Sequence, residues 1–220
     1  MFHNRRRLGA VRVPFVAVGG SPITWTAVAN PAEGAAGTTV TFTSVALGAT
    51  DPTRATLVLV STEATIATGC SVGGNAMTKG IEEATTISSL QIWGLNTSGL
   101  GTTANIVLTA GGTMTAPMIM VGRFTGINTL FSATSALNTA AADPAQITAT
   151  VPSGGFGIAA IIANTLNTGT WSNATVDYRT NLSSTKTLSM AHNSSVGSQT
   201  MSYSGLGGAV SHMVMATFSP

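Results

Sequence analysis

One short stretch of the chain has the residue types of a nucleophilic site. The sequence Gly-Cys-Ser-Val-Gly around Ser71 matches the G-x-S-x-G pattern that exposes a nucleophilic serine in many hydrolases, where a strand precedes the serine and a helix follows it. The next seven residues, GNAMTKG, predict a turn instead, so we expect Ser71 to be a turn residue. None of His3, His192 and His212 has an acidic residue at a spacing that would orient it. A partner from elsewhere in the fold stays open, but the sequence predicts no catalytic residue and no enzyme.

The acidic residues offer little for metal binding or for glycoside hydrolysis, which needs two carboxylates in one cleft. The chain has seven of them, namely Glu33, Asp51, Glu63, Glu82, Glu83, Asp143 and Asp177. Two precede proline, as is typical of turns, and Glu82 with Glu83 predicts a solvated loop pair. No His/Cys cluster and no calcium-loop motif is present. We therefore predict no metal and no cofactor, and leave open a calcium ion held by carboxylates from separate loops.

Aromatic side chains could present a platform to a sugar ring. Trp93 lies among apolar residues in SLQIWGLN, so we expect it to be a core residue. Trp171 lies in the polar stretch NTGTWSNATVDYRT, close to Tyr178 and Arg179. We take Trp171, Tyr178 and Arg179 as candidate glycan contacts, with packing of this loop as the alternative for Trp171.

The first twenty residues, MFHNRRRLGAVRVPFVAVGG, carry four of the nine basic residues and no acid, so they hold a charge of +4. The remaining five basic and seven acidic residues give the other 200 positions a charge of −2. An export signal is disfavoured, because Arg12 and Pro14 interrupt the apolar run and no small-x-small cleavage site follows.

The arginines could contact phosphates or pair with carboxylates of another protein. The body is faintly acidic and only 5% aromatic, so it offers no surface that would continue a nucleic-acid contact. We therefore expect residues 1–20 to be an extended arm that docks on a protein partner by strand addition, and we expect no nucleic acid. The docking residues that we predict are Arg5, Arg6, Arg7, Arg12, Val13, Pro14 and Phe15.

Composition predicts an all-β fold. Only 7% of the 220 residues are charged, against about 25% in typical soluble domains, and Thr, Ser, Ala and Gly stand at most polar positions. Cys70 is the one cysteine, so no intramolecular disulfide exists, and we expect it to be a small buried apolar residue. No apolar run is long enough to span a membrane.

Short runs with apolar alternation or continuous apolar character predict ten strands. They cover residues 38–45, 55–61, 89–96, 104–110, 116–124, 145–151, 156–164, 186–192, 199–204 and 211–218. The strands of 38–124 are echoed in order by those of 145–218, which predicts two pseudo-repeated halves joined around residues 125–144. We expect residues 21–220 to form a jelly-roll-like antiparallel β-sandwich, with one large sandwich or two small ones left open.

The series LVLVSTEA, SVGGNAMTKG, SLQIWGLN, TTANIVLTAGG and MIMVGRFTGI, closed by SHMVMATFSP, resembles a β-sandwich domain of tailed-phage virion proteins. The resemblance covers roughly residues 38–220 and implies a structural role in a virion. We therefore expect a capsid decoration, head fibre or collar component that forms a homo-oligomer, a trimer by our expectation, and docks on a capsid, neck or tail protein. The alternative is a receptor- or carbohydrate-binding module of a tail fibre.

Overall fold

The computed structural model describes residues 23–85, 88–127, 129–139, 143–164, 166, 169–182, 186–207 and 211–220. The predicted docking arm at residues 1–20 lies outside these ranges. The described residues contain strands and no helix, and every strand pair in them is antiparallel. The predicted all-β, antiparallel sandwich class is thereby confirmed.

The first half of the chain contributes β1 (Thr24–Glu33), β2 (Gly37–Ala46), β3 (Ala55–Glu63), β4 (Gly69–Val72), β5 (Asn75–Ala76), β6 (Thr78–Ala84), β7 (Ser88–Asn96) and β8 (Thr103–Thr125). The second half contributes β9 (Thr129–Thr139), β10 (Ala145–Val151), β11 (Phe156–Ala163), β12 (Thr170–Ser172), β13 (Thr175–Leu182), β14 (Lys186–Asn193), β15 (Gly197–Ser204) and β16 (Ser211–Ser219).

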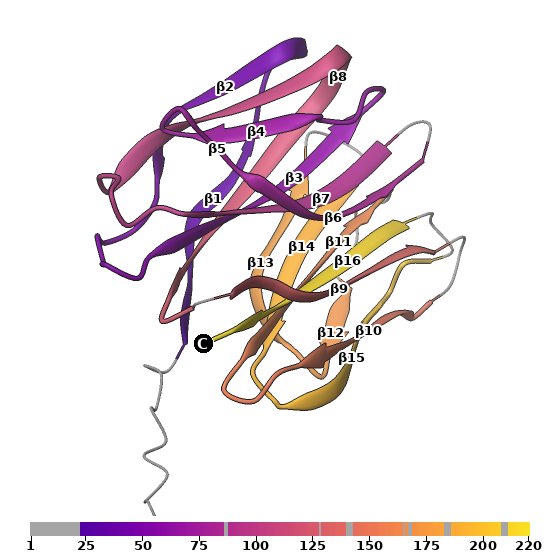
Figure 1. The fold of residues 1–220 in the computed structure, drawn as a ribbon. Helices are drawn as coiled ribbons and strands as arrows, with labels where there is room; N and C mark the ends of the chain where they lie inside the picture. Colours follow the sequence, from indigo (N-terminus) through magenta and orange to yellow (C-terminus); the bar gives the residue numbers. More distant parts are fainter. Residues whose placement is uncertain are drawn as a thin grey trace, which may run out of the picture.

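The described strands form four layers, which Figure 1 shows stacked from top to bottom. The long strand β8 belongs to two of them, because its first part pairs with β2 and β4 and its last part pairs with β1 and β3. The layers are, in order, β2-β8-β4-β5, then β1-β8-β3-β7-β6, then β13-β14-β11-β16-β9, and finally β10-β15-β12. The described strands thus form two small sandwiches stacked on each other.

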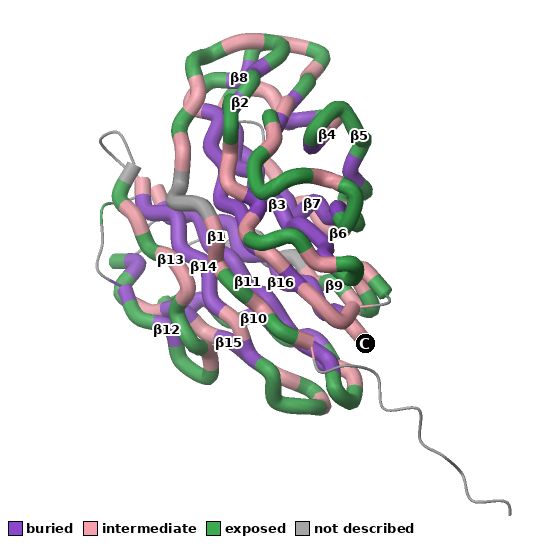
Figure 2. Tube along the Cα trace, turned by 90° about the vertical axis from the view of Figure 1, so that its left-hand side faces the viewer, coloured by how far each residue is buried: buried purple, intermediate pink, exposed green. Residues whose placement is uncertain are grey.

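Burial follows from the layer that a strand occupies. The central strands of the two inner sheets have an apolar sheet on either side, so β11 and nearly all of β3 and β16 are buried on both faces. The outermost strand β10 instead alternates buried and exposed residues along its whole length. Figure 2 shows the same contrast, with buried segments in the inner sheets and exposed ones in the outer strands and turns.

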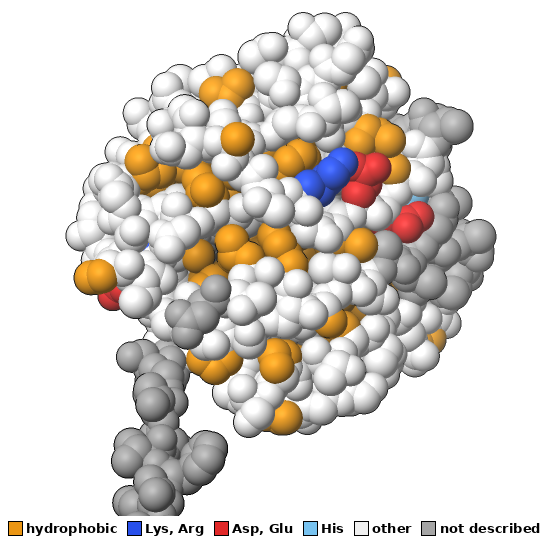
Figure 3. Space-filling model, viewed as in Figure 1, with side chains coloured by type: hydrophobic (Ala, Val, Ile, Leu, Met, Phe, Trp, Pro, Cys, Tyr) orange, Lys and Arg blue, Asp and Glu red, His pale blue; other side chains and the backbone are white. Residues whose placement is uncertain are grey.

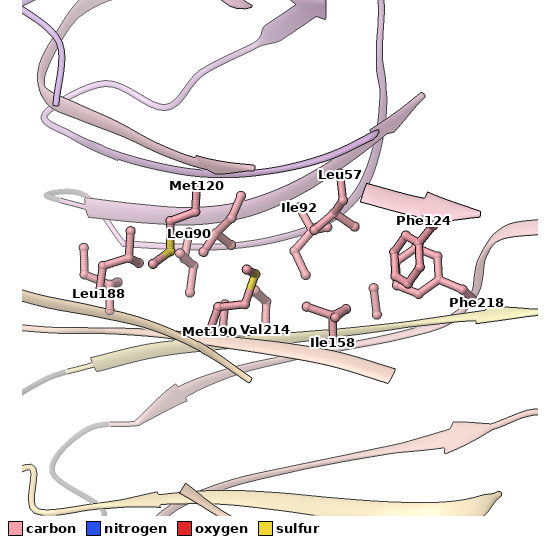
Figure 4. Close-up of a cluster of buried hydrophobic side chains, with 14 of the residues drawn as sticks. Leu57, Leu90, Ile92, Met120, Phe124, Ile158, Leu188, Met190, Val214 and Phe218 are labelled. Atoms are coloured by element: carbon pink, nitrogen blue, oxygen red, sulfur yellow. The ribbon is translucent and has the colours of Figure 1, made fainter. Parts of the chain in front are cut away.

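Three apolar cores lie between the four layers. One core fills each small sandwich, and the third joins the two inner sheets. Figure 4 shows this central core, with Leu57, Ile92 and Met120 facing Ile158, Met190 and Val214. Because this contact is apolar throughout its centre, the two halves form one folded unit.

The two halves use the same strand pairings. In the first half β1, β2, β3 and β4 each pair with β8, β3 also pairs with β7, and β6 pairs with β7. In the second half β9 and β11 pair with β16, β10 and β12 pair with β15, and β14 pairs with β11 and β13. β1 lies near β13, and β6 lies near β9. The halves therefore meet as the two copies of a symmetric dimer would, with the same sheet of each copy in the contact.

Candidate functional site

Our prediction that Trp171 is an exposed aromatic contact is wrong. Trp171 is on β12 and only 9% exposed. Its ring lies edge-on to Tyr203, with 5.3 Å between ring centroids, and its Nε1 donates a hydrogen bond to Ser189 Oγ at 2.8 Å. The indole belongs to the core of the second sandwich, because pairing of β12 with β15 turns it inward. It offers no face to a sugar ring.

Tyr178 and Arg179 lie on the neighbouring strand β13. Tyr178 is half-buried against the central core, and burial, followed by the charge of Asp177, raises the pKa of its hydroxyl. Arg179 is exposed, and its guanidinium donates to the carbonyl of Gly169. The three residues that we predicted as a glycan contact therefore do not form one exposed surface.

Ser71 and Cys70 lie on β4, which is followed by the turn at Gly73 and Gly74 and then by β5. Ser71 is thus a strand residue and not the turn residue that we expected, and the helix that a nucleophile elbow requires does not follow it. Cys70 is buried, as predicted. Burial raises the pKa of its thiol to about 12, so the thiolate that cysteine chemistry needs is absent near neutral pH.

The strand pair β13 and β14 brings together a carboxylate and an imidazole that are 15 residues apart in sequence. The pairing register shifts between Val176 and Tyr178, so Asp177 is the extra residue of a β-bulge. A bulge re-aims a side chain, and here the carboxylate lies beside the ring of His192. His192 Nδ1 donates to Asp177 Oδ1 at 2.7 Å. The sequence did not reveal this pair.

The His192 ring is fixed from two sides. Asp177 holds one edge, and the ring of Phe156 stacks on it with 4.9 Å between centroids and 23° between planes. The side chain of His192 is 25% exposed and that of Asp177 is 8% exposed. Since Nδ1 carries the donated proton, Nε2 is a hydrogen-bond acceptor when the ring is neutral, and it has no partner among the described residues. The pair can therefore accept a hydrogen bond from a ligand at Nε2.

A hollow of about 330 Å³ lies against this ring. Its wall comes from two chain connections: Asn173 to Thr175, between β12 and β13, and His192 to Ser195, at the end of β14. Asn193 ties them together, because its Nδ2 donates to the carbonyl of Asn173 at 2.7 Å. The N–H of Ser195 donates to Asn193 Oδ1 at 2.6 Å. The walls of the hollow are thus held in place by hydrogen bonds within the chain.

A second polar cluster links the two halves. Ser88 Oγ lies 2.7 Å from His212 Nε2, and Lys186 forms an ion pair with Glu63. Ser88 is 4% exposed and His212 is 1% exposed, so a substrate cannot reach this serine. Burial, followed by the nearby charge of Lys186, lowers the pKa of His212. The cluster is a polar seam between the halves, buried at Ser88 and His212 and partly exposed at Lys186 and Glu63, and the serine and histidine are not a catalytic pair.

Charge is distributed very unevenly over the four layers. The strands β2, β4, β5, β10, β12 and β15 contain no charged residue, and neither does the part of β8 that pairs with β2 and β4. Their outward positions are rich in hydroxyls, such as Thr148 and Thr200, whose Oγ1 atoms lie 2.7 Å apart. On the face shown in Figure 3, charged side chains are few and most of the surface is uncharged. Lys79 and Glu82 of β6, an inner-sheet strand, form an ion pair at 2.6 Å.

Within the described part of the chain, no three His, Cys, Asp or Glu side chains come close enough together to hold a metal ion. The same residues contain no helix that is long and apolar enough to cross a membrane. In comparisons with known proteins, no family model matches the chain and no curated protein is similar to it.

Proposed function

We propose that this chain is a non-enzymatic structural protein of a bacteriophage particle, a capsid decoration, head fibre or collar component. The observation that supports this proposal best is the absence of charge from both outermost layers of the described fold. Soluble proteins normally protect the edges of such sheets with charged side chains. Here the edge strands β2 and β10 carry threonine and glutamine instead.

Neutral sheet edges favour lasting contact with other subunits, because backbone groups of an edge strand can pair with another chain. In the proposed particle the outer layers pack against further copies of the chain, and a closed homo-oligomer, for which we propose a trimer, is the ordinary result. The N-terminal arm, with Arg5, Arg6 and Arg7, anchors this assembly on a capsid, neck or tail protein through acidic groups of that protein.

Particle composition tests this proposal. Phage particles are purified from the source culture on a density gradient, and their proteins are identified by mass spectrometry. The proposal predicts peptides of this chain in the particle band at a constant ratio to the major capsid protein. Particles that contain none of it would exclude a virion role.

The anchor is tested with full-length variants added to particles that lack the protein. Replacing Arg5, Arg6 and Arg7 by alanine is expected to abolish incorporation. The control Lys79→Ala removes one exposed charge from the body and is expected to incorporate normally. Normal incorporation of the triple variant would contradict the anchor while leaving the virion role intact.

A further inference from the structure

The internal repeat shows what the fold itself requires at the position of His192. The phenylalanines near the ends of β8 and β16 set the register of the two halves, because Phe124 pairs with Ala55 of β3 and Phe218 pairs with Phe156 of β11. Ala55 and Phe156 are therefore equivalent positions.

Leu57 and Ile158 lie two residues after these equivalent positions, and the residues that pair with them on the next strand differ. Leu57 pairs with Gly94 of β7 in the first half, and Ile158 pairs with His192 of β14 in the second half. His192 thus stands where the first half has glycine.

The same comparison applies to Asp177. β6 pairs with β7 as β13 pairs with β14, and its register shifts between Lys79 and Ile81, so Gly80 is the extra residue of the corresponding bulge. Asp177 is the extra residue in the second half. Both members of the polar pair therefore stand where the first half has glycines, and the first half has the same strand pairing and bulge without them.

The local chain differs as well. In the first half the strand β4 reaches β6 through an additional hairpin strand, β5. In the second half Asn173 and Ala174 alone connect β12 with β13, and these two residues line the hollow. Asn173 has a φ of 57°, a left-handed conformation that asparagine adopts more readily than most residues. The second half thus combines a shorter connection, an open hollow and a polar pair in one place.

We propose that this hollow binds a saccharide. Its lining includes His192, Thr175, Ser194 and Ser195, and no lysine, arginine or carboxylate lines it. Such a set of hydroxyl, amide and imidazole groups suits a ligand whose own groups are hydroxyls. The size of the hollow lies at the lower end of the range for small-molecule sites.

Other ligand chemistries fit less well. A phosphate group would call for a cationic side chain, and none lines the hollow. A zinc ion would need at least three protein ligands, whereas His192 is the one strong ligand in the wall. Asp177 acts through the imidazole, because its Oδ1 fixes the ring so that Nε2 is the acceptor. Asp177 is thus a positioning residue, and His192 touches the ligand. This site does not depend on the proposed virion role.

The test uses the full-length protein and a panel of glucose, galactose, mannose, rhamnose and N-acetylglucosamine. Binding is measured by saturation-transfer NMR and by the imidazole signals of histidine-labelled protein, with inorganic phosphate and Zn²⁺ as separate additions. The variant that carries Asp177→Gly and His192→Gly installs the residues of the first half. It is expected to keep its circular dichroism spectrum and to bind at least about tenfold more weakly, as for the loss of one net hydrogen bond or more.

Two further variants complete the experiment. Lys79→Ala changes the residue beside the corresponding bulge of the first half and is expected to bind as the unaltered protein does. His192→Gln keeps a donor toward Asp177 but loses the ring, and it must also lose binding, which provides the test if the double variant does not fold. Unchanged binding by the folded double variant or by His192→Gln, no response to any sugar, or a His192 shift with phosphate or Zn²⁺ alone would each overturn the proposal.

Discussion

Two equivalent positions carry glycines in the first half of this molecule and polar side chains in the second half. In the first half Gly80 and Gly94 leave a notch that the ring of Phe131, from β9, fills, because a Cβ at Gly80 would overlap this ring. In the second half Asp177 and His192 occupy the same two positions and form a hydrogen-bonded pair beside an open hollow. Both halves therefore have the bulge, whereas the residues at these two positions decide whether the space beside it is filled by another ring or left open.

The turn that precedes β3 in the first half and the equivalent turn that precedes β11 in the second half also differ in one side chain. The N–H of Arg54 donates to the carbonyl of Asp51, and the N–H of Gly155 donates to that of Pro152, so Arg54 and Gly155 are equivalent. Gly155 has no side chain. The guanidinium of Arg54 is fully buried and donates to the carbonyls of Gly48, Thr97 and Leu100. The guanidinium of Arg54 thus holds together the two loops of the first half that contain Gly48 and Thr97.

Removal of the Arg54 guanidinium is expected to have the largest effect on stability. Arg54→Ala leaves several buried carbonyls without a donor, so the free energy of unfolding should fall by about 4 kcal/mol. Urea denaturation followed by tryptophan fluorescence measures this loss. Lys79→Ala, which removes an exposed charge, should change it by less than about 0.5 kcal/mol. A loss for Arg54→Ala as small as this would show that the loops close without the guanidinium.

The notch in the first half gives the next largest effect. Gly80→Ala places a methyl group against the Phe131 ring and should lower the free energy of unfolding by about 2 kcal/mol, as overpacking does. The control is Gly111→Ala on β8, where a Cβ meets no atom within 4 Å. If both alanines have the same effect on the urea midpoint, the packing of Phe131 on the glycines contributes nothing to stability.

The sequence predicted most of the strands that lie inside the layers and missed most of those at the edges. Nine of the ten predicted strands fall within described strands, because two-sided burial requires continuous apolar runs and one-sided burial requires alternation. The tenth, 156–164, ends one residue beyond β11. β1, β4, β5, β6, β9, β12 and β13 were missed. Of these, β1, β6, β9 and β13 form the edges of the two inner sheets, where polar residues are accepted on both faces, and β9 lies inside the segment that we expected to be a linker. The other three are short strands of the outer layers. β8 runs straight through Gly111 and Gly112, where we expected a break.

The candidate site was harder to predict than the fold. Asp177 reaches His192 only because a bulge shifts the register by one residue, and the register of paired strands is not encoded in the spacing of two residues along the chain. One signal was present in the repeat: aligning Leu90 with Leu188 puts Gly94 opposite His192. Trp171 misled us because its neighbours in sequence are polar, although its own position on β12 faces the core.

The polar seam between the halves predicts a pH dependence. Burial lowers the pKa of His212 from its ordinary value of 6.5, so the unfolded chain binds a proton at this residue more readily than the folded chain. Stability from this residue is therefore complete above about pH 6.5 and falls as the pH decreases below this value. Its equivalent in the first half is Met118, because Ser61 pairs with Met118 as Ile162 pairs with His212. His212→Met should flatten the decline in melting temperature between pH 7 and pH 5, and an unchanged decline would assign it to other groups.

The smallest effect concerns reactivity and not stability. Cys70 lies in the core of the first sandwich, and burial raises the pKa of its thiol to about 12, so almost no thiolate forms at pH 8 and no reagent reaches the sulfur. The folded protein should therefore leave a thiol-reactive disulfide reagent unconsumed for hours, while the urea-unfolded protein should react with one equivalent at once. Rapid labelling of the folded protein would mean that the sheet of β4 and β5 opens easily. In that case the additional hairpin of the first half would be a loosely held strand pair, and the contrast with the short connection of the second half would be one of stability as well as of shape.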